Sequence, residues 1–475
     1  MIDILLVNPK ETDGFFEKMP PLGLASLAAN LEKHDYSVKI IDSEIESRTL
    51  DYWLNLYHPQ FLGISGTTHT RFESFRLAKE AKIFNKAIIT VYGGVHASFA
   101  AVDTLKRVPE IDYVLRGEGE ETIVDLIKAY KTDLNITDVR GLTYRDSNDI
   151  TENPSAYRVD LNEIPMPAYK HLDMKRYSLK MEFIGKKGIS LITSRGCLAQ
   201  CSFCSASRMF NHLVSTRNAQ SVIDEIALLF DRYGYKGIKI FDSTLTIDQN
   251  HISSLCDAII KHGLNFPWEC EIRVGTVDPG LLAKMKQAGC YYADLGIESG
   301  SQKVLDLMRK GITVEQSEET LELCNQAGIR VKAFFSFGHI GETMKDVERT
   351  FEFIDKHRHL ISTVASGAGV RIYPGTYLES YARKNGLIPH DFDWSAPYDD
   401  KRLASILQTT SVPILIQPQL GFDELEKIAL RIYGQRYRGW KGFKLGLTKV
   451  TDPGRIRKLT RVLKLNLKNR LKKKE

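Results

Sequence analysis

The sequence has no cysteine before position 197 and no hydrophobic run long enough to cross a bilayer. Only seven cysteines occur in 475 residues, which excludes a disulfide framework like that of small secreted proteins. The first residues, Met1–Val7, include an acid at position 3, and their apolar run is too short for a signal peptide. We therefore expect a cytoplasmic protein whose thiols stay reduced.

The body of the chain also lacks an excess of positive charge. The formal net charge is +6, but residues 451–475 hold ten Lys or Arg against two acids, so the remaining chain is slightly acidic. This tail predicts a basic amphipathic helix, which suits peripheral contact with an anionic membrane surface. A solvated tail is an equal alternative, and contact with nucleic acid is disfavoured. The apolar positions recur at helical spacing: Ile456, Leu459, Val462, Leu463, Leu467 and Leu471.

Three cysteines lie within eight residues, at Cys197, Cys201 and Cys204. They follow the apolar run Ile189–Thr193 and the turn pair Arg195-Gly196, so we expect a loop that leaves a buried strand. Thiolates suit zinc or iron–sulfur clusters, but structural zinc needs a fourth ligand that is not nearby. Three thiolates on a four-iron cluster would leave one iron without a protein ligand. The alternative is three buried cysteines without a metal, which is the role we expect for Cys256, Cys270, Cys290 and Cys324.

Residues 1–140 alternate short apolar runs with helical patterns, which predicts a doubly wound parallel sheet of the flavodoxin-like kind. Such sheets bind ligands beyond the carboxyl ends of their strands. The expected strands are Ile2–Val7, Val38–Ile41, Phe61–Ser65, Ala87–Tyr92 and Ile111–Leu115, and the expected helices are Leu22–Glu32, Phe72–Lys82 and Glu120–Tyr130.

Small and polar residues follow these predicted strands. Glycines there would let the backbone approach a ligand closely, and hydroxyl groups could bind phosphate or amide groups. A nucleotide, flavin or corrinoid site would look alike at this level, and both histidines could equally be ordinary hydrogen-bonding residues. The candidate residues are Ser65, Thr67, Thr68, His69, Gly93, Gly94, His96, Gly117 and Glu118.

The rest of the chain divides into three parts. Residues 141–185 predict a hairpin followed by an extended, proline-containing linker. Residues 186–390 predict a partial (β/α)6 barrel of the TIM type, and residues 391–475 a small, mostly helical region with a helix at Phe422–Tyr433. The six expected barrel strands are Ile189–Thr193, Gly237–Phe241, Pro267–Arg273, Tyr291–Ile297, Val331–Phe337 and Val364–Tyr373.

The spacing Cys-x3-Cys-x2-Cys resembles that of the radical S-adenosylmethionine (SAM) family. The segments Pro20–Ala25, Gly93–Ala97 and Arg116–Glu120 resemble the cobalamin (B12)-binding domain that precedes many of its barrels, as in class B radical SAM methyltransferases, magnesium-protoporphyrin cyclases and hopanoid-modifying enzymes. The resemblance implies a [4Fe-4S] cluster whose open iron is chelated by SAM, a 5′-deoxyadenosyl radical and bound cobalamin. Residues 8–14 lack the Asp-x-His-x-x-Gly motif that would supply a histidine below the cobalt.

The resemblance also implies roles for the predicted barrel strand ends. Asp242 and Ser243 would contact the amino group of SAM, Glu271 its ribose hydroxyls and Arg273 its carboxylate. The segment Gly296-Ile-Glu298-Ser299-Gly300 resembles the family's SAM-contacting segment. The alternative for each acid is a solvated strand-end residue.

The predicted function is methylation of an unactivated carbon on a hydrophobic, lipid or isoprenoid, substrate, with an external reductant of the flavodoxin or ferredoxin type. One alternative is a radical reaction without methylation, such as cyclisation, ring contraction, oxidation or carbon–carbon coupling. Another is a non-enzymatic sensor of corrinoids or nucleotides. A methylthiotransferase is disfavoured because its second cluster needs cysteines ahead of Cys197.

Overall fold

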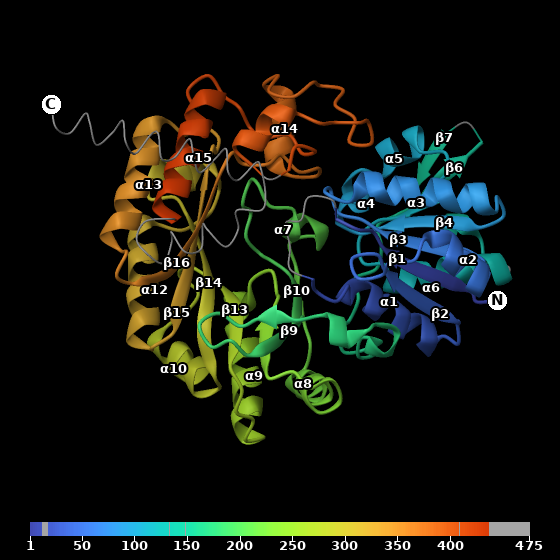
Figure 1. Ribbon diagram of the computed structural model, residues 1–475, viewed down its shortest axis with the longest axis horizontal. Coiled ribbons are helices and arrows are strands. Elements are labelled where there is room, and N and C mark those ends of the chain that lie inside the picture. Colours follow the sequence, from blue (N-terminus) through green and yellow to red (C-terminus); the bar gives the residue numbers. More distant parts are fainter. Residues whose placement is uncertain (12–17, 133, 148, 408, 437–475) are drawn as a thin grey trace.

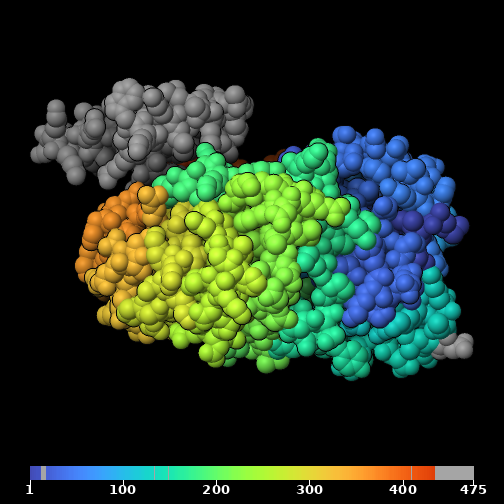
Figure 2. All heavy atoms as spheres, turned by 90° about the horizontal axis from the view of Figure 1, so that it is seen from below, coloured from blue at the N-terminus to red at the C-terminus, as the bar shows by residue number. Residues whose placement is uncertain are grey.

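The computed structural model describes residues 1–11, 18–132, 134–147, 149–407 and 409–436. Two sheets, each of seven strands, lie side by side in this part of the chain (Figure 1). We call the first sheet with its helices the N-terminal half and the second the barrel half. In the space-filling view the two halves pack against each other, with teal and green residues between them (Figure 2).

The N-terminal sheet has the strand order β2-β1-β3-β4-β5-β6-β7. Its first five strands are parallel, which confirms the predicted doubly wound sheet. The hairpin expected after residue 140 adds two antiparallel strands at one edge, so the sheet is mixed and continues to Glu152. The strands are β1 (Ile4–Asn8), β2 (Val38–Asp42), β3 (Phe61–Ser65), β4 (Ile89–Gly93), β5 (Tyr113–Leu115), β6 (Leu142–Asp146) and β7 (Asp149–Glu152).

Alternation along the strands divides the core between the two faces of this sheet. In β1, Ile4 and Leu6 belong to the apolar cluster that includes α1 and α6, while Leu5 and Val7 belong to the cluster of α2 and α3. A strand buried on both faces needs this continuous apolar run. The helices are α1 (Leu22–Lys33), α2 (Leu50–Tyr57), α3 (Arg71–Phe84), α4 (Val95–Phe99), α5 (Ala101–Arg107) and α6 (Glu120–Lys131).

The barrel sheet has the order β16-β15-β14-β13-β12-β9-β8. Six strands are parallel, and the short β8 is antiparallel at one edge. The edge strands β8 and β16 do not pair with each other, so the barrel is open, as predicted. The strands are β8 (Leu179–Lys180), β9 (Lys187–Leu191), β12 (Gly237–Ile240), β13 (Trp268–Arg273), β14 (Cys290–Glu298), β15 (Arg330–Phe337) and β16 (Ile361–Ala368).

A helix follows each of the first five parallel barrel strands, so the carboxyl ends of the strands share one edge. Local capping fixes where several helices begin. The side chain of Thr313 accepts a hydrogen bond from the backbone N–H of Gln316, whose side chain returns to the cap, a capping box that starts α12. The helices are α8 (Ala219–Tyr233), α9 (Gln249–Lys261), α10 (Pro279–Gln287), α11 (Gln302–Leu307), α12 (Val314–Gln326) and α13 (Met344–Lys356).

A small hairpin and a short helix lie between the two halves (Figure 1). The hairpin pairs β10 (Ser194–Gly196) with β11 (Val214–Thr216), and α7 (Ala206–Met209) lies between these strands in the sequence. The connector 153–178 contributes the 3-10 turns Tyr169–His171 and Met174–Arg176; others are Ile136–Asp138, Leu245–Ile247 and Lys401–Ser405.

The segment between α14 (Tyr377–Lys384) and α15 (Phe422–Arg436) returns to the N-terminal half. Helix α14 lies above the seam, and α15, the predicted C-terminal helix, packs on β16 (Figure 1). The buried guanidinium of Arg71 donates to the carbonyls of Trp394, at 2.9 Å, and Ser411, at 2.7 Å. The predicted basic helix lies outside the described residues, and no described helix has the length and hydropathy needed to span a bilayer.

Candidate active site

The three-cysteine loop begins directly after β10, between the two halves. The turn into it needs glycine, because Gly196 has φ of 95° and an added Cβ would lie 2.0 Å from the Leu213 carbonyl oxygen. Burial first, and then the neighbouring Cys201 and Cys197, raises the pKa of Cys204 to about 11. The loop therefore holds Cys197 and Cys201 close enough to Cys204 to raise the pKa of its thiol.

The residues around the loop fit the predicted iron–sulfur cluster. Within the described residues no three His, Cys, Asp or Glu side chains could share one metal ion. A four-iron cluster does not require this, because each thiolate binds a different iron. Cys197 Sγ lies 3.7 Å from Thr244 Oγ1, and Arg273 donates to Cys201 Sγ at 3.9 Å. The thiols thus adjoin residues that follow β12 and end β13, where a cluster would face the mouth of the barrel.

Glu298, at the end of β14, forms the centre of a buried polar network. Its carboxylate pairs with Lys310 Nζ at 2.9 Å and accepts from Ser336 Oγ at 2.9 Å. Burial is the largest single effect and raises the pKa of Glu298, but Lys310, with His339 and Ser336, holds that pKa below its usual value. Gly296 makes room for this pair, because a Cβ there would lie 2.9 Å from Glu298 Oε1. The backbone of Glu298 is left-handed, with φ of 69°, at a register shift between β14 and β15.

Glu271 lies on the same strand face as Arg273, beside a pair of opposite charges. Lys239 Nζ and Asp294 Oδ2 are 2.7 Å apart, and both side chains act on the pKa of Glu271. Burial first, and then the like charge of Asp294, raises that pKa to about 7. Glu269, two residues earlier in β13, accepts hydrogen bonds from Tyr291 and from the backbone N–H of Glu182. The strand thus offers Glu271 as the carboxyl nearer the cysteine loop.

Asp242, unlike the other predicted SAM contacts, has both carboxylate oxygens engaged by the residues just before the cysteine loop. Its buried carboxylate accepts from the Thr193 backbone N–H at 2.7 Å and from the hydroxyls of Thr193 and Ser194 at 2.6 and 2.7 Å. These bonds anchor the chain just before the cysteine loop. Ser243 is exposed, whereas Ser299 is buried with its hydroxyl 3.0 Å from that of Thr350.

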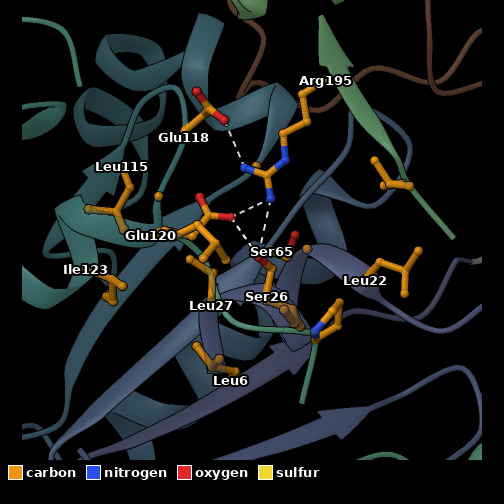
Figure 3. A pocket seen from close by; sticks show the side chains of 18 of the residues that line it. Leu6, Leu22, Ser26, Leu27, Ser65, Leu115, Glu118, Glu120, Ile123 and Arg195 are labelled. Atoms are coloured by element: carbon orange, nitrogen blue, oxygen red, sulfur yellow. Dashed lines mark hydrogen bonds and ion pairs between the residues drawn. The ribbon is translucent and has the colours of Figure 1, made fainter. Parts of the chain in front are cut away.

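A cavity of about 250 Å³ opens at the carboxyl ends of β1, β3, β4 and β5 (Figure 3). Its predicted residues include Ser65, Gly93, Gly94, Gly117 and Glu118. Most of the wall is apolar, which suits a flat organic group. The apolar residues include Leu6, Leu22, Leu27, Ile64, Leu115 and Ile123.

Gly94 lines this cavity where two loops approach each other closely. It has φ of 101°, and a Cβ there would lie 2.7 Å from the Gly66 carbonyl oxygen, so the close approach of the two loops requires glycine. The glycines leave backbone, rather than side chains, next to the cavity. A backbone cradle of this kind beside apolar walls fits the cobalamin that the sequence predicted.

Four predicted residues lie elsewhere. The hydroxyl and backbone N–H of Thr67 bond with Thr70, and the hydroxyl of Thr68 lies 3.1 Å from His96 Nδ1. His96 is buried edge-on against Trp394 and does not line the cavity of Figure 3. Burial, and then the charge of Arg71, lowers the pKa of His96 to about 3, so its ring is neutral at physiological pH. His69 faces the barrel half, where Nε2 lies 3.0 Å from the Tyr373 hydroxyl.

The sequence reasoning missed the charged group at the mouth of the cavity. Arg195 donates to Glu118 at 2.9 Å, to Glu120 at 2.6 Å and to the Ser26 hydroxyl at 3.3 Å (Figure 3). Burial raises the pKa of the Glu120 carboxyl, but the Arg195 guanidinium outweighs burial and holds that pKa below its usual value. The position of Arg195, two residues before Cys197, was the available signal, but its partners lie at least 75 residues away in the sequence.

Comparison with known proteins identifies both halves. The radical SAM superfamily matches residues 191–354, and the B12 binding domain matches residues 15–127. An uncharacterized methyltransferase of Pyrococcus horikoshii is 33% identical over 82% of this chain and 84% of its own length. A hopanoid C-3 methylase of Methylococcus capsulatus is 28% identical over 90% of this chain and 78% of its own.

A solved structure shares the fold across almost the whole chain. The cobalamin-dependent S-adenosylmethionine radical enzyme OxsB, with aqua-cobalamin and S-adenosylmethionine bound, superposes with a TM-score of 0.75. The match covers 99% of this chain and 71% of that one at 18% identity. At this identity the likeness establishes the order and packing of the two halves.

Proposed function

Because the chain belongs to the cobalamin-dependent radical SAM methyltransferases, we propose that it methylates an unactivated carbon of a hydrophobic substrate. The cofactors are a [4Fe-4S] cluster, SAM and cobalamin, and together they supply the radical and the methyl group. The observation that carries the proposal is the position of the cysteine loop, between the barrel mouth and the cavity of the N-terminal half.

The chain's own contribution is to hold and orient these groups. Cys197, Cys201 and Cys204 would bind three irons as thiolates, so the raised pKa of Cys204 means that cluster assembly releases its proton. Glu298 and Arg273 would orient SAM through charge-assisted hydrogen bonds, with Gly296 giving room for the approach.

Other proposed contacts follow from position. Glu271 would accept from the ribose hydroxyls and exposed Ser243 would contact the amino group, whereas Asp242 and buried Ser299 would act by fixing the backbone around them. Ser65, Gly93, Gly94, Gly117 and Glu118 would line the cobalamin site.

Two exposed apolar side chains support a hydrophobic substrate. Leu198 is 52% exposed within the cysteine loop, and Phe241 is 40% exposed directly after β12. Apolar side chains left uncovered beside polar cofactor contacts are a feature of sites that take an apolar ligand. The relative named as a hopanoid methylase acts, by that name, on a lipid. A one-electron donor of the flavodoxin or ferredoxin type would reduce the cluster.

The test compares two cysteine variants after anaerobic reconstitution with iron and sulfide. We expect Cys201→Ala to lose most bound iron and all SAM cleavage, while Cys324→Ala, which changes a buried cysteine outside the loop, keeps both. The reconstituted wild type is given SAM, cobalamin and reductant with a lipid extract or, in a separate reaction, a water-soluble extract. The reaction with the lipid extract should yield products heavier by one methylene. Products of unchanged carbon count would contradict methyl transfer, and methylation confined to water-soluble extracts would contradict a hydrophobic substrate.

A further inference from the structure

A second cavity, of about 220 Å³, adjoins the first along the seam between the two halves. The two cavities share four lining residues, so they are neighbouring lobes of one cleft. The shared residues are Gly117, Glu118, Met209 and Phe210. The first lobe is mostly apolar, whereas the second is polar and takes three arginines from three different parts of the chain.

These arginines line one cavity although they come from different parts of the sequence. Arg116 follows β5 of the N-terminal sheet, Arg158 lies on the connector, and Arg208 is on α7, four residues after Cys204. Helix α7 lies between the two halves (Figure 1). We call this second cavity the arginine lobe. Its wall also presents polar groups from Ser98, Ser155, Tyr157 and Asn211.

Arg116 is held in place by neutral partners. Its Nε donates to Thr143 Oγ1 at 2.7 Å, and an Nη donates to the Asn153 carbonyl. The nearest carboxylate is that of Glu152, at 3.6 Å, and its side chain is half exposed. The guanidinium is thus oriented mainly by neutral groups, and its ion pair with Glu152 is long and partly exposed to solvent.

The other two arginines are exposed, and within the described chain no carboxylate lies within 4 Å of either Arg158 or Arg208. Arg158 donates to the neutral hydroxyl of Ser215 at 2.7 Å. The acid in the wall, Glu118, is already engaged by Arg195. The arginine lobe therefore carries an excess of positive charge that the described protein does not balance.

Like charges gathered in a cleft repel each other, and an anion relieves that repulsion. Guanidinium groups match the geometry of phosphate oxygens through paired hydrogen bonds. We propose that the arginine lobe binds a phosphoryl group carried by a ligand of this cleft. Two ligands of the cleft could carry it: cobalamin, through the phosphodiester of its nucleotide loop, or a phosphorylated substrate.

The test removes charge from the lobe and measures binding, which needs no turnover and so stands apart from the proposed methylation. The variant is Arg158→Gln/Arg208→Gln. The matched control is Arg176→Gln/Arg358→Gln, which removes the same charge from two exposed arginines elsewhere. Three probes are titrated into each anaerobic protein: hydroxocobalamin, cobinamide, which lacks the phosphodiester, and inorganic pyrophosphate. Circular dichroism and the melting temperature establish that the variants fold.

A phosphodiester held by the lobe predicts that the lobe variant loses at least about tenfold in affinity for hydroxocobalamin and little for cobinamide. A phosphorylated substrate predicts unchanged corrinoid binding, with pyrophosphate bound by the wild type and control but at least about tenfold more weakly by the lobe variant. Equal binding of all three probes by the lobe variant and the control would overturn the proposal.

Discussion

At the residue scale, two buried titratable side chains predict a pH dependence, His96 of protein stability and Glu271 of SAM affinity. His96 has a pKa of about 3 in the folded protein, lowered by burial and by Arg71, against about 6.5 in an unfolded chain. The unfolded state therefore binds one more proton between these values, and stability falls as the pH drops from about 6.5 toward 3. In His96→Gln the slope should be shallower by up to about 1.4 kcal/mol per pH unit.

Urea unfolding of both proteins at several pH values between 4.5 and 7.5 measures this slope. The His262→Gln variant is a control, because that histidine is exposed and its ring lies 3.2 Å from the side-chain oxygen of Gln220. If the free energy of unfolding depends on pH equally in the wild type and in His96→Gln, then His96 has the same pKa in the folded and unfolded states, which would contradict the prediction.

Glu271 gives a prediction for SAM binding. Its pKa is raised to about 7 by burial and by Asp294, so the fraction ionised rises across neutral pH. A carboxylate accepts hydrogen bonds more strongly than a neutral carboxyl. If Glu271 holds the ribose hydroxyls, SAM affinity should increase about threefold or more between pH 6 and pH 8. The Glu271→Gln variant should bind SAM more weakly and without this dependence.

Isothermal titration of the anaerobic, reconstituted protein with SAM measures these affinities. Glu269→Gln serves as the control on the same strand, because its carboxylate is engaged by Tyr291 and Glu182. If the SAM affinity of Glu271→Gln still rises between pH 6 and pH 8, a group other than Glu271 causes that pH dependence.

The sequence predicts the cluster cysteines more directly than it predicts the roles of the strand-end acids. Cys197, Cys201 and Cys204 act through local spacing, so the sequence displays them together. Whether a strand-end residue is free or engaged depends on distant partners. Asp242 and Glu271 look alike in the sequence, but Thr193 and Ser194 take both oxygens of the first.

At the element scale, the ion pairs of Arg195 connect β10 with the start of α6. Arg195→Gln would leave Glu118 and Glu120 buried without their cation, at a cost of about 3 kcal/mol in the free energy of unfolding. The double variant Arg195→Gln/Glu120→Gln should recover part of this loss, because one stranded charge is gone. Chemical denaturation of the wild type, both single variants and the double variant checks the prediction; additive losses would mean that the pair is not coupled.

Most elements could be predicted because their apolar periods are long and regular. The parallel strands of both sheets agree with the predicted ranges to within a few residues, except for the last: β16 ends at Ala368, five residues before the predicted end. The helices α2, α4 and α5 were missed because each spans only five to eight residues, too few for a helical period to stand out. The hairpin was predicted, but its membership in the N-terminal sheet rests on pairing with β5, which local patterns do not encode.

At the scale of the whole molecule, the C-terminal region ties the two halves together. Arg71 in α3 binds the carbonyls of Trp394 and Ser411, and Arg107 pairs with Asp393 at 2.5 Å. The sequence could not reveal these contacts, because their partners are more than 280 residues apart. The boundaries 1–140, 141–185, 186–390 and 391–475 stay a proposal, and the first sheet crosses the earliest of them.

Removing the Arg71 guanidinium should loosen this connection. In Arg71→Gln, backbone amides of residues 391–415 should exchange hydrogen about tenfold faster, since each lost charged hydrogen bond contributes about 1.5 kcal/mol or more. Arg107→Gln, whose ion pair is more exposed, should show a smaller change. Hydrogen exchange read by mass spectrometry distinguishes the two, and equal protection in Arg71→Gln and the wild type would contradict the role of Arg71.

The polypeptide leaves the first sheet at residue 152 and returns to the N-terminal half at Trp394 and Ser411, which contact α3, so the chain forms a closed circuit through both halves. If cobalamin binds in the seam, as proposed above, we expect that circuit to enclose it. Its entry and release would then require the return contacts to break transiently. We expect the corrinoid to stay bound through many turnovers and to dissociate far more slowly than the substrate.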